Sequence, residues 1–154
     1  MKSFLLLICL FLLYGCMGGY QSPVWDGYHE RNYNNLVEIR RLAEEQASLI
    51  KDKTTDFELL EQKIGRATLI MIDQQNNCNR IYRTSSYFDC SITLRLVASK
   101  SAEMEVITAD YFAKNGMKDK AKEMYRNIII TYVGDAYKSY VKQAEFGLKD
   151  LEEK

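Results

Sequence analysis

Hydrophobic positions along most of this chain recur three and four residues apart, the spacing that places side chains on one face of an α-helix. The first such stripe consists of Leu36, Ile39, Leu42, Ala43, Gln46, Leu49 and Ile50. Charged side chains occupy the opposite face. The pattern therefore predicts an amphipathic helix over residues 36–53.

A second stripe follows a short polar break and consists of Phe57, Leu60, Ile64, Ala67 and Met71. The preceding Thr55-x-x-Glu58 matches a capping box, in which a hydroxyl and a carboxylate satisfy free backbone N–H groups. Two helices joined by so short a connection pack antiparallel, which predicts a helical hairpin over residues 36–77. The run from Leu69 to Ile72 is apolar on all sides, so we expect this part of the hairpin to be buried most deeply.

Periodicity is lost over residues 78–90, whose sequence is CNRIYRTSSYFDC. The Gln and Asn residues at 74–77 in front of it favour a turn, because Asn is a poor helix former. We interpret residues 78–90 as an irregular loop. Residues 92–96 alternate as in a short strand, but no partner strand is evident and their apolar spacing also suits a helix, which we favour.

The C-terminal third contains further helical stretches separated by glycines. We expect helices over 101–115 and 117–133, with Gly116 in the turn between them. Asp135 is a suitable N-cap for a last helix that reaches Glu152. Together these patterns predict an all-α fold of about five helices, arranged as antiparallel hairpins.

Small and aromatic residues alternate within this region in a particular order: Ala109, Phe112, Ala121 and Tyr125. On these residues, the segment 101–134 resembles a tetratricopeptide repeat, a helix–turn–helix unit of about 34 residues. It is also similar to the repeats of outer-membrane assembly lipoproteins. The resemblance implies a repeat-like region over 91–154, with a C-terminal capping helix, that binds a protein partner.

Three positions depart from the repeat pattern: Glu105 stands where it has Trp, Thr108 where it has Leu, and Gly134 where it has Pro. No second copy precedes the segment with the same spacing. A single repeat cannot bury its own face, so the hairpin over 36–77 would have to cover it. An ordinary helical hairpin in a bundle is the alternative interpretation.

The first sixteen residues, MKSFLLLICLFLLYGC, form a different kind of segment. Their apolar run is shorter than the roughly 20 residues that span a bilayer, and its layout is that of a secretory signal. The ending Leu13-Tyr14-Gly15-Cys16 resembles the lipobox of bacterial lipoproteins, although Tyr14 departs from the usual small or aliphatic residue. The resemblance implies that residues 1–15 are removed and that Cys16 carries lipid. An ordinary cleaved signal and an uncleaved anchor are the alternatives.

Residues 16–35 have no hydrophobic period and mix Gly, Pro and Asn with aromatic side chains, so we interpret them as a lipidated tether,. Trp25 and Tyr28 could rest on the bilayer interface or fold back onto the first helix, and we favour the second. No Asp follows Cys16. In a Gram-negative host the resemblance then implies the periplasmic side of the outer membrane, and in a Gram-positive host the cell membrane.

The lipoprotein interpretation also assigns the remaining cysteines. Cys9 leaves with the signal, so Cys78 and Cys90 remain in an oxidising compartment,. A disulfide between them would stabilise the loop by roughly 3 kcal/mol, and two buried free thiols are the alternative. We expect no zinc site, because such sites need four ligands and His29 is the only histidine,.

Charge and motifs argue against several functions. The 21 basic residues balance the 21 acidic ones, which disfavours nucleic acid as a partner,. No Gly-rich phosphate loop or G-x-S-x-G motif is present, and one histidine gives little basis for nucleophilic catalysis. Pairs of neighbouring carboxylates have the spacing of solvated helix faces. We therefore expect neither enzymatic activity nor a cofactor.

Three tyrosines close together in the sequence, Tyr132, Tyr137 and Tyr140, are the candidate partner-binding residues. Aromatic side chains dominate the energetics of protein interfaces, but core packing is the role that we favour for these three. The sequence thus predicts a lipid-anchored interaction or scaffold protein of the cell envelope. An exclusion or immunity lipoprotein that blocks a phage, conjugation or toxin receptor is the alternative function.

Overall fold

The computed structural model describes residues 23–82, 84 and 86–153, with side chains from residue 27 onward. The predicted signal segment 1–15, Cys16 and the first part of the predicted tether lie outside the described residues. Within the described ranges the chain is helical and contains no strand, which confirms the all-α prediction. Residues 92–96 accordingly belong to a helix. None of the helices in these ranges is both long and apolar enough to cross a bilayer.

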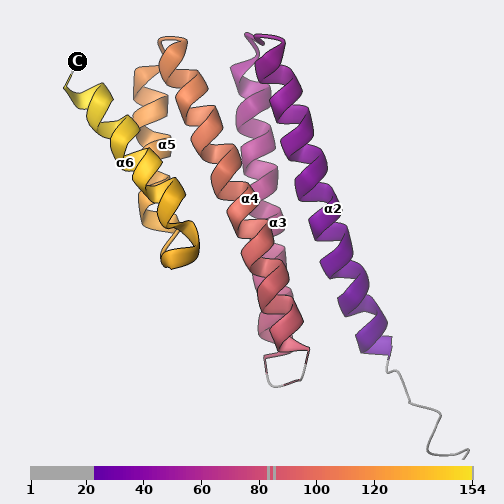
Figure 1. The fold of residues 1–154 in the computed structure, drawn as a ribbon. Coiled ribbons are helices and arrows are strands. Elements are labelled where there is room, and N and C mark those ends of the chain that lie inside the picture. The colour runs from indigo at the N-terminus through magenta and orange to yellow at the C-terminus, as the bar shows by residue number, and fades with distance from the viewer. Residues whose placement is uncertain (1–22, 83, 85, 154) are drawn as a thin grey trace, which may run out of the picture. The chain divides into compact units, whose positions relative to one another are not determined.

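Five α-helices and one 3₁₀ turn follow one another along the chain (Figure 1). They are α2 (Pro23–Lys51), α3 (Phe57–Arg80), α4 (Tyr87–Lys114), α5 (Lys118–Thr131), η1 (Asp135–Tyr137) and α6 (Lys138–Glu152). The chain divides within α2 into two units, Met1–Glu30 and Arg31–Lys154. The contacts described below lie within the second unit.

Helix α2 begins at Pro23, so the tether prediction is wrong for residues 23–35. Proline is well tolerated in the first helical turn, because the N–H that it lacks would have no partner there. Asn35 is part of the helix, and its Nδ2 donates to Gln74 Oε1 at 2.9 Å. Amide side chains in this part of α2 hydrogen-bond to α3 in place of apolar packing. Residues before Leu36 therefore show no hydrophobic period, and the pattern placed the helix start too late.

Both ends of α3 also differ from the prediction. Its N-cap is Asp56, whose Oδ1 accepts a hydrogen bond from the Leu59 N–H at 2.9 Å, so the capping box proposed at Thr55 is wrong. The helix continues through 74–77, where a turn was expected, as far as Arg80. It can do so because amide side chains in that stretch are buried and hydrogen-bonded to α2.

Helix α4 is one continuous helix of 28 residues. It shortens the loop predicted over 78–90 to residues 81–86, so that Cys78 and Cys90 both lie within helices. Their sulfur atoms form a disulfide with the Cα atoms 5.4 Å apart, and both residues are buried. The disulfide therefore joins the end of α3 to the start of α4.

A cluster of buried amides surrounds this disulfide. Asn32 Oδ1 accepts hydrogen bonds from Gln74 Nε2 at 2.7 Å and from Asn77 Nδ2 at 3.0 Å. Gln74 Nε2 also lies 3.2 Å from Cys90 Sγ. These contacts hold α2, α3 and α4 together at the end of the bundle that contains the disulfide, hereafter the disulfide end.

Two hydrophobic clusters fill the interior. The first, between α2, α3 and α4, contains Ile39, Leu42, Ala67, Ile70, Val97 and Met104. The second, in which α4 meets α5 and α6, includes Ala109, Phe112, Ala121 and Tyr125, the four residues on which the repeat resemblance rests. Small residues let the backbones approach, and the rings fill the space beside them.

The prediction of deepest burial at residues 69–72 is wrong at two positions. Leu69 is 59% exposed and Ile72 is 48% exposed, whereas Ile70 between them is buried. Helix α3 is packed on some of its sides only, and an apolar stretch without polar interruption must then leave apolar side chains on the open side. The two exposed side chains are a consequence of that partial cover.

The turns around α5 depend on two glycines with positive φ. Gly116, at φ 83°, separates α4 from α5 as predicted, and Gly134, at φ 113°, follows α5,. The last helix does not begin at Asp135. That residue starts the η1 turn instead, and α6 begins at Lys138.

Replacing both Cys78 and Cys90 with Ala is expected to lower the free energy of unfolding by about 3 kcal/mol, because the disulfide restricts the unfolded chain. Urea denaturation monitored by circular dichroism measures the change. Wild-type protein under reducing denaturing conditions is the control. An unchanged unfolding midpoint in the double variant would contradict a stabilising role for the disulfide.

Candidate functional site

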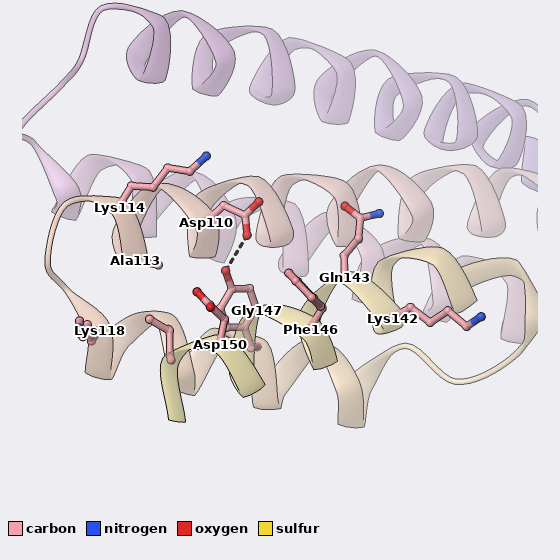
Figure 2. Close-up of a pocket in the computed structure, with 11 residues that line it drawn as sticks. Asp110, Ala113, Lys114, Lys118, Lys142, Gln143, Phe146, Gly147 and Asp150 are labelled. Atoms are coloured by element: carbon pink, nitrogen blue, oxygen red, sulfur yellow. Dashed lines mark hydrogen bonds between the residues drawn. The ribbon is translucent and has the colours of Figure 1, made fainter. Parts of the chain in front are cut away.

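A cleft of about 610 Å³ opens between the C-terminal part of α4 and helices α5 and α6. Figure 2 shows the side chains that line it, which come from all three helices. The site exists because Gly116 turns α5 back along α4, and Gly134 then turns α6 back along α5. The cleft thus belongs to the same part of the fold as the repeat-like residues.

The floor of the cleft is formed by a close contact between α5 and α6. The Tyr125 ring is 2% exposed, and a Cβ atom added to Gly147 would lie only 2.4 Å from its Cζ atom. Tyr125 Oη donates to Asp110 Oδ1 at 2.6 Å, the bond that is drawn in Figure 2. Burial, and secondarily this bond to a carboxylate, raises the pKa of Tyr125, so the hydroxyl stays protonated,.

The rim of the cleft carries Lys114, Lys118 and Lys142. None of the three forms an ion pair with a residue in the described ranges. Asp110 and Asp150 contribute the opposite charge, and Asp110 is already engaged by a tyrosine. The rim therefore presents ammonium groups whose charge is only partly balanced.

Phe146 also lines the cleft, and its side chain is 75% exposed. A large ring so open to water has an unfavourable hydration cost, which contact with another molecule would relieve. Together with the neighbouring lysines it makes a surface that can bind apolar and anionic groups at once. This arrangement suits recognition of another polypeptide.

The predicted tyrosines occupy different environments. Tyr132 is 2% exposed, which agrees with the favoured core-packing role and not with a place in an exposed patch. Its ring packs on Tyr137 with centroids 5.6 Å apart, and Tyr137 and Tyr140 are both half-buried. Tyr132 and Tyr137 border a smaller hollow of about 340 Å³ beside α3, which Tyr140 does not reach. Tyr132 directly follows α5, Tyr137 ends η1 and Tyr140 lies in the first turn of α6, where the chain reverses.

Glu105 is a buried carboxylate that the sequence did not identify as such. Its Oε1 accepts a hydrogen bond from Tyr132 Oη at 2.6 Å and lies 3.4 Å from Ser101 Oγ. Burial raises the pKa of Glu105, and the hydrogen bonds from Tyr132 and Ser101 oppose that rise,. The sequence feature that could have identified Glu105 was its departure from the repeat pattern, which has Trp at this position.

No known protein family, curated protein or solved structure matches this chain.

The site therefore has to be interpreted from its own residues. Across the part of the chain that the structure describes, no group of three or more His, Cys, Asp or Glu side chains is placed to hold a metal ion. Lipidation at Cys16 lies outside the described residues.

Phe146 was not identified from the sequence. It lies outside the apolar stripe formed by Ala144, Leu148 and Leu151, and an aromatic residue outside such a stripe indicates an exposed ring,.

Gly147→Ala is expected to lower the free energy of unfolding by about 1–2 kcal/mol. The added methyl group clashes with the buried Tyr125 ring, and this cost exceeds the gain in helix propensity,. Gly65→Ala is the matched control, because no atom lies within 4 Å of its added Cβ. That variant should gain up to about 1 kcal/mol. Urea denaturation measures both, and equal shifts would contradict the close α5–α6 contact.

Glu105→Gln is expected to become more stable relative to wild type as pH rises from about 4 to about 7.5. The folded state holds the Glu105 proton above the ordinary pKa of 4.5, so the associated stability is present at low pH and is lost as pH rises through the raised pKa,. Gln does not titrate. Urea denaturation at several pH values measures the difference, with Glu123→Gln at an exposed position of α5 as control. The same pH dependence in both variants would exclude a special role for Glu105.

Proposed function

We propose that this chain is a lipoprotein of the bacterial envelope, anchored through Cys16, that binds a protein partner in the cleft between α4, α5 and α6. The observation that carries the proposal is Phe146, a ring 75% exposed at a concave surface. Exposed aromatic residues beside cationic side chains are frequent energetic centres of protein interfaces. The partner would offer an apolar side chain for the ring and carboxylates for the lysines.

The anchor rests on the resemblance of residues 13–16 to a lipobox. The absence of Asp after Cys16 favours the outer membrane, on its periplasmic side, if the host is Gram-negative. The disulfide between Cys78 and Cys90 is compatible with this oxidising compartment,. The repeat-like order of Ala109 and Phe112 also supports a role in protein binding rather than catalysis.

Scaffolding and exclusion are two versions of the same activity, because both need a bound protein partner and differ in its identity. An envelope assembly component would make the chain a scaffold. A receptor used by a phage, a conjugation system or a toxin would make it an exclusion lipoprotein. We favour the scaffold function, since the repeat resemblance is to assembly lipoproteins.

A photo-crosslinking amino acid at Phe146, incorporated in whole cells, is expected to give a discrete adduct with one protein, because this ring lies at the edge of the cleft. Mass spectrometry of the adduct identifies the partner. Ile130 on α5 is the matched control position, since it is 74% exposed and does not line the cleft.

Lys142→Glu should reduce the Phe146 adduct by reversing charge at the rim, without changing the amount of protein in the membrane fraction. Adducts of equal yield from positions 146 and 130, or none from either, would exclude the cleft as the binding site.

Cys16→Ser should abolish labelling by radioactive palmitate. Labelling that persists in this variant would exclude lipidation at Cys16.

A further inference from the structure

Exposed aromatic residues gather where α3 leads into α4, at the disulfide end of the bundle. Tyr82 is 65% exposed and Phe88 is 69% exposed. Tyr82 packs edge-on against Tyr87, with ring centroids 4.8 Å apart. We call these three residues the aromatic tip. Figure 1 shows that α5 and α6 run beside the other part of α4 and leave this end uncovered.

The aromatic tip is held on a rigid support. The disulfide between Cys78 and Cys90 lies directly behind it, and Asn32 of α2 is hydrogen-bonded to Gln74 and Asn77 at the same level. Both cysteines and all three amides are buried. The rings therefore cannot be withdrawn from water by a local rearrangement without breaking these contacts.

The aromatic tip is also at the end of the bundle where the chain arrives from its N-terminus. Asn32 is only sixteen residues after Cys16. Residues from Pro23 onward are helical, at about 1.5 Å per residue, and those before extend at most about 3.5 Å each,. A lipid on Cys16 would therefore keep the disulfide end within about 40 Å of the bilayer.

We propose that the aromatic tip rests on the lipid bilayer surface and orients the lipid-anchored domain. This inference depends on the proposed anchor at Cys16. Tyrosine rings favour the membrane–water interface, where the ring is among acyl chains and the hydroxyl reaches water. The exposed side chain of Arg80, the last residue of α3, is placed to meet lipid phosphates,.

Tethering makes even a weak contact effective. A surface held within a few tens of ångströms of the bilayer experiences it at high effective concentration, so a few interfacial rings suffice to bias orientation. A soluble protein partner at the aromatic tip would gain no such advantage from the tether. The bilayer is therefore the occupant that the position of this surface favours.

The orientation has a consequence for the cleft. Phe88 and Lys114 are 26 residues apart on one straight helix, a separation of roughly 39 Å,. With the aromatic tip on the bilayer and α4 upright, the cleft would lie at the end of α4 that is farther from the membrane. Its partner would then approach from the aqueous side.

The test uses lipidated full-length protein in vesicles of phosphatidylethanolamine and phosphatidylglycerol with brominated acyl chains. Phe88→Trp in a Trp25→Phe background places a single fluorophore at the aromatic tip. Its emission is expected to shift to shorter wavelength and to lose intensity by bromine quenching. Phe146→Trp in the same background is the matched control, as it replaces an equally exposed ring at the cleft, and should show neither change.

Absence of quenching at position 88, in protein that still floats with the vesicles, would overturn the contact and leave the anchor intact. Equal quenching at both positions would also overturn it. Loss of flotation in protein that should be lipidated would overturn the anchor and the contact together.

Hydrogen–deuterium exchange gives a second measurement without substitutions at the aromatic tip. Amides around residues 86–92 should exchange more slowly on vesicles than in detergent-free solution of the Cys16→Ser protein. If these amides are protected from exchange only when envelope proteins are added, the aromatic tip binds a protein partner and the proposal is overturned.

Discussion

Buried amide side chains fix how α2 lies on the rest of the bundle. At the disulfide end, Asn32 accepts from Gln74 and Asn77. Farther along, Gln46 donates to the Met104 carbonyl oxygen at 2.7 Å and to Thr108. A buried amide without a partner is costly, so each of these contacts is satisfied in one register of the helices only. Among the residues that the structure describes, every buried side-chain nitrogen and oxygen has a hydrogen-bond partner.

The same contacts show what the sequence could and could not predict. The all-α fold and the stripe through Ile39 and Leu42 follow from helical periodicity, since apolar burial repeats with the helix. The start of α2 does not, because the helix before Leu36 is rich in polar residues such as Asn32 and resembles a tether in sequence. Pairing of amides across helices has no period, and only the three-dimensional arrangement identifies it.

The candidate site divides in a similar way. The packing of Ala109 with Tyr125 could be anticipated from the alternation of small and aromatic residues. Two of the three departures from the repeat pattern, Glu105 and Thr108, are buried and hydrogen-bonded to residues outside α4, Glu105 to Tyr132 and Thr108 to Gln46. These two residues, which do not fit the repeat pattern, therefore make specific tertiary contacts. The apolar stripe of α6 indicates that Phe146 is exposed, but its position at a cleft depends on how α6 packs against α4 and α5, which local sequence does not determine.

The two hydrophobic clusters share α4, and α3 contributes to both, whereas the buried residues of α5 and α6 belong to the second cluster alone. The disulfide and the buried amides join α2, α3 and α4. The hairpin of α5 and α6 is attached by apolar contacts, by the Tyr125–Asp110 and Tyr132–Glu105 hydrogen bonds and by the exposed Lys120–Glu61 ion pair. Parts of a protein that are held by such different contacts unfold locally with different free energies and behave as separate cooperative units. Fluctuations of the hairpin away from α4 would change the width of the cleft while the three long helices stay assembled. Affinity for a partner would then depend on the cost of closing that hairpin as well as on the surface it presents.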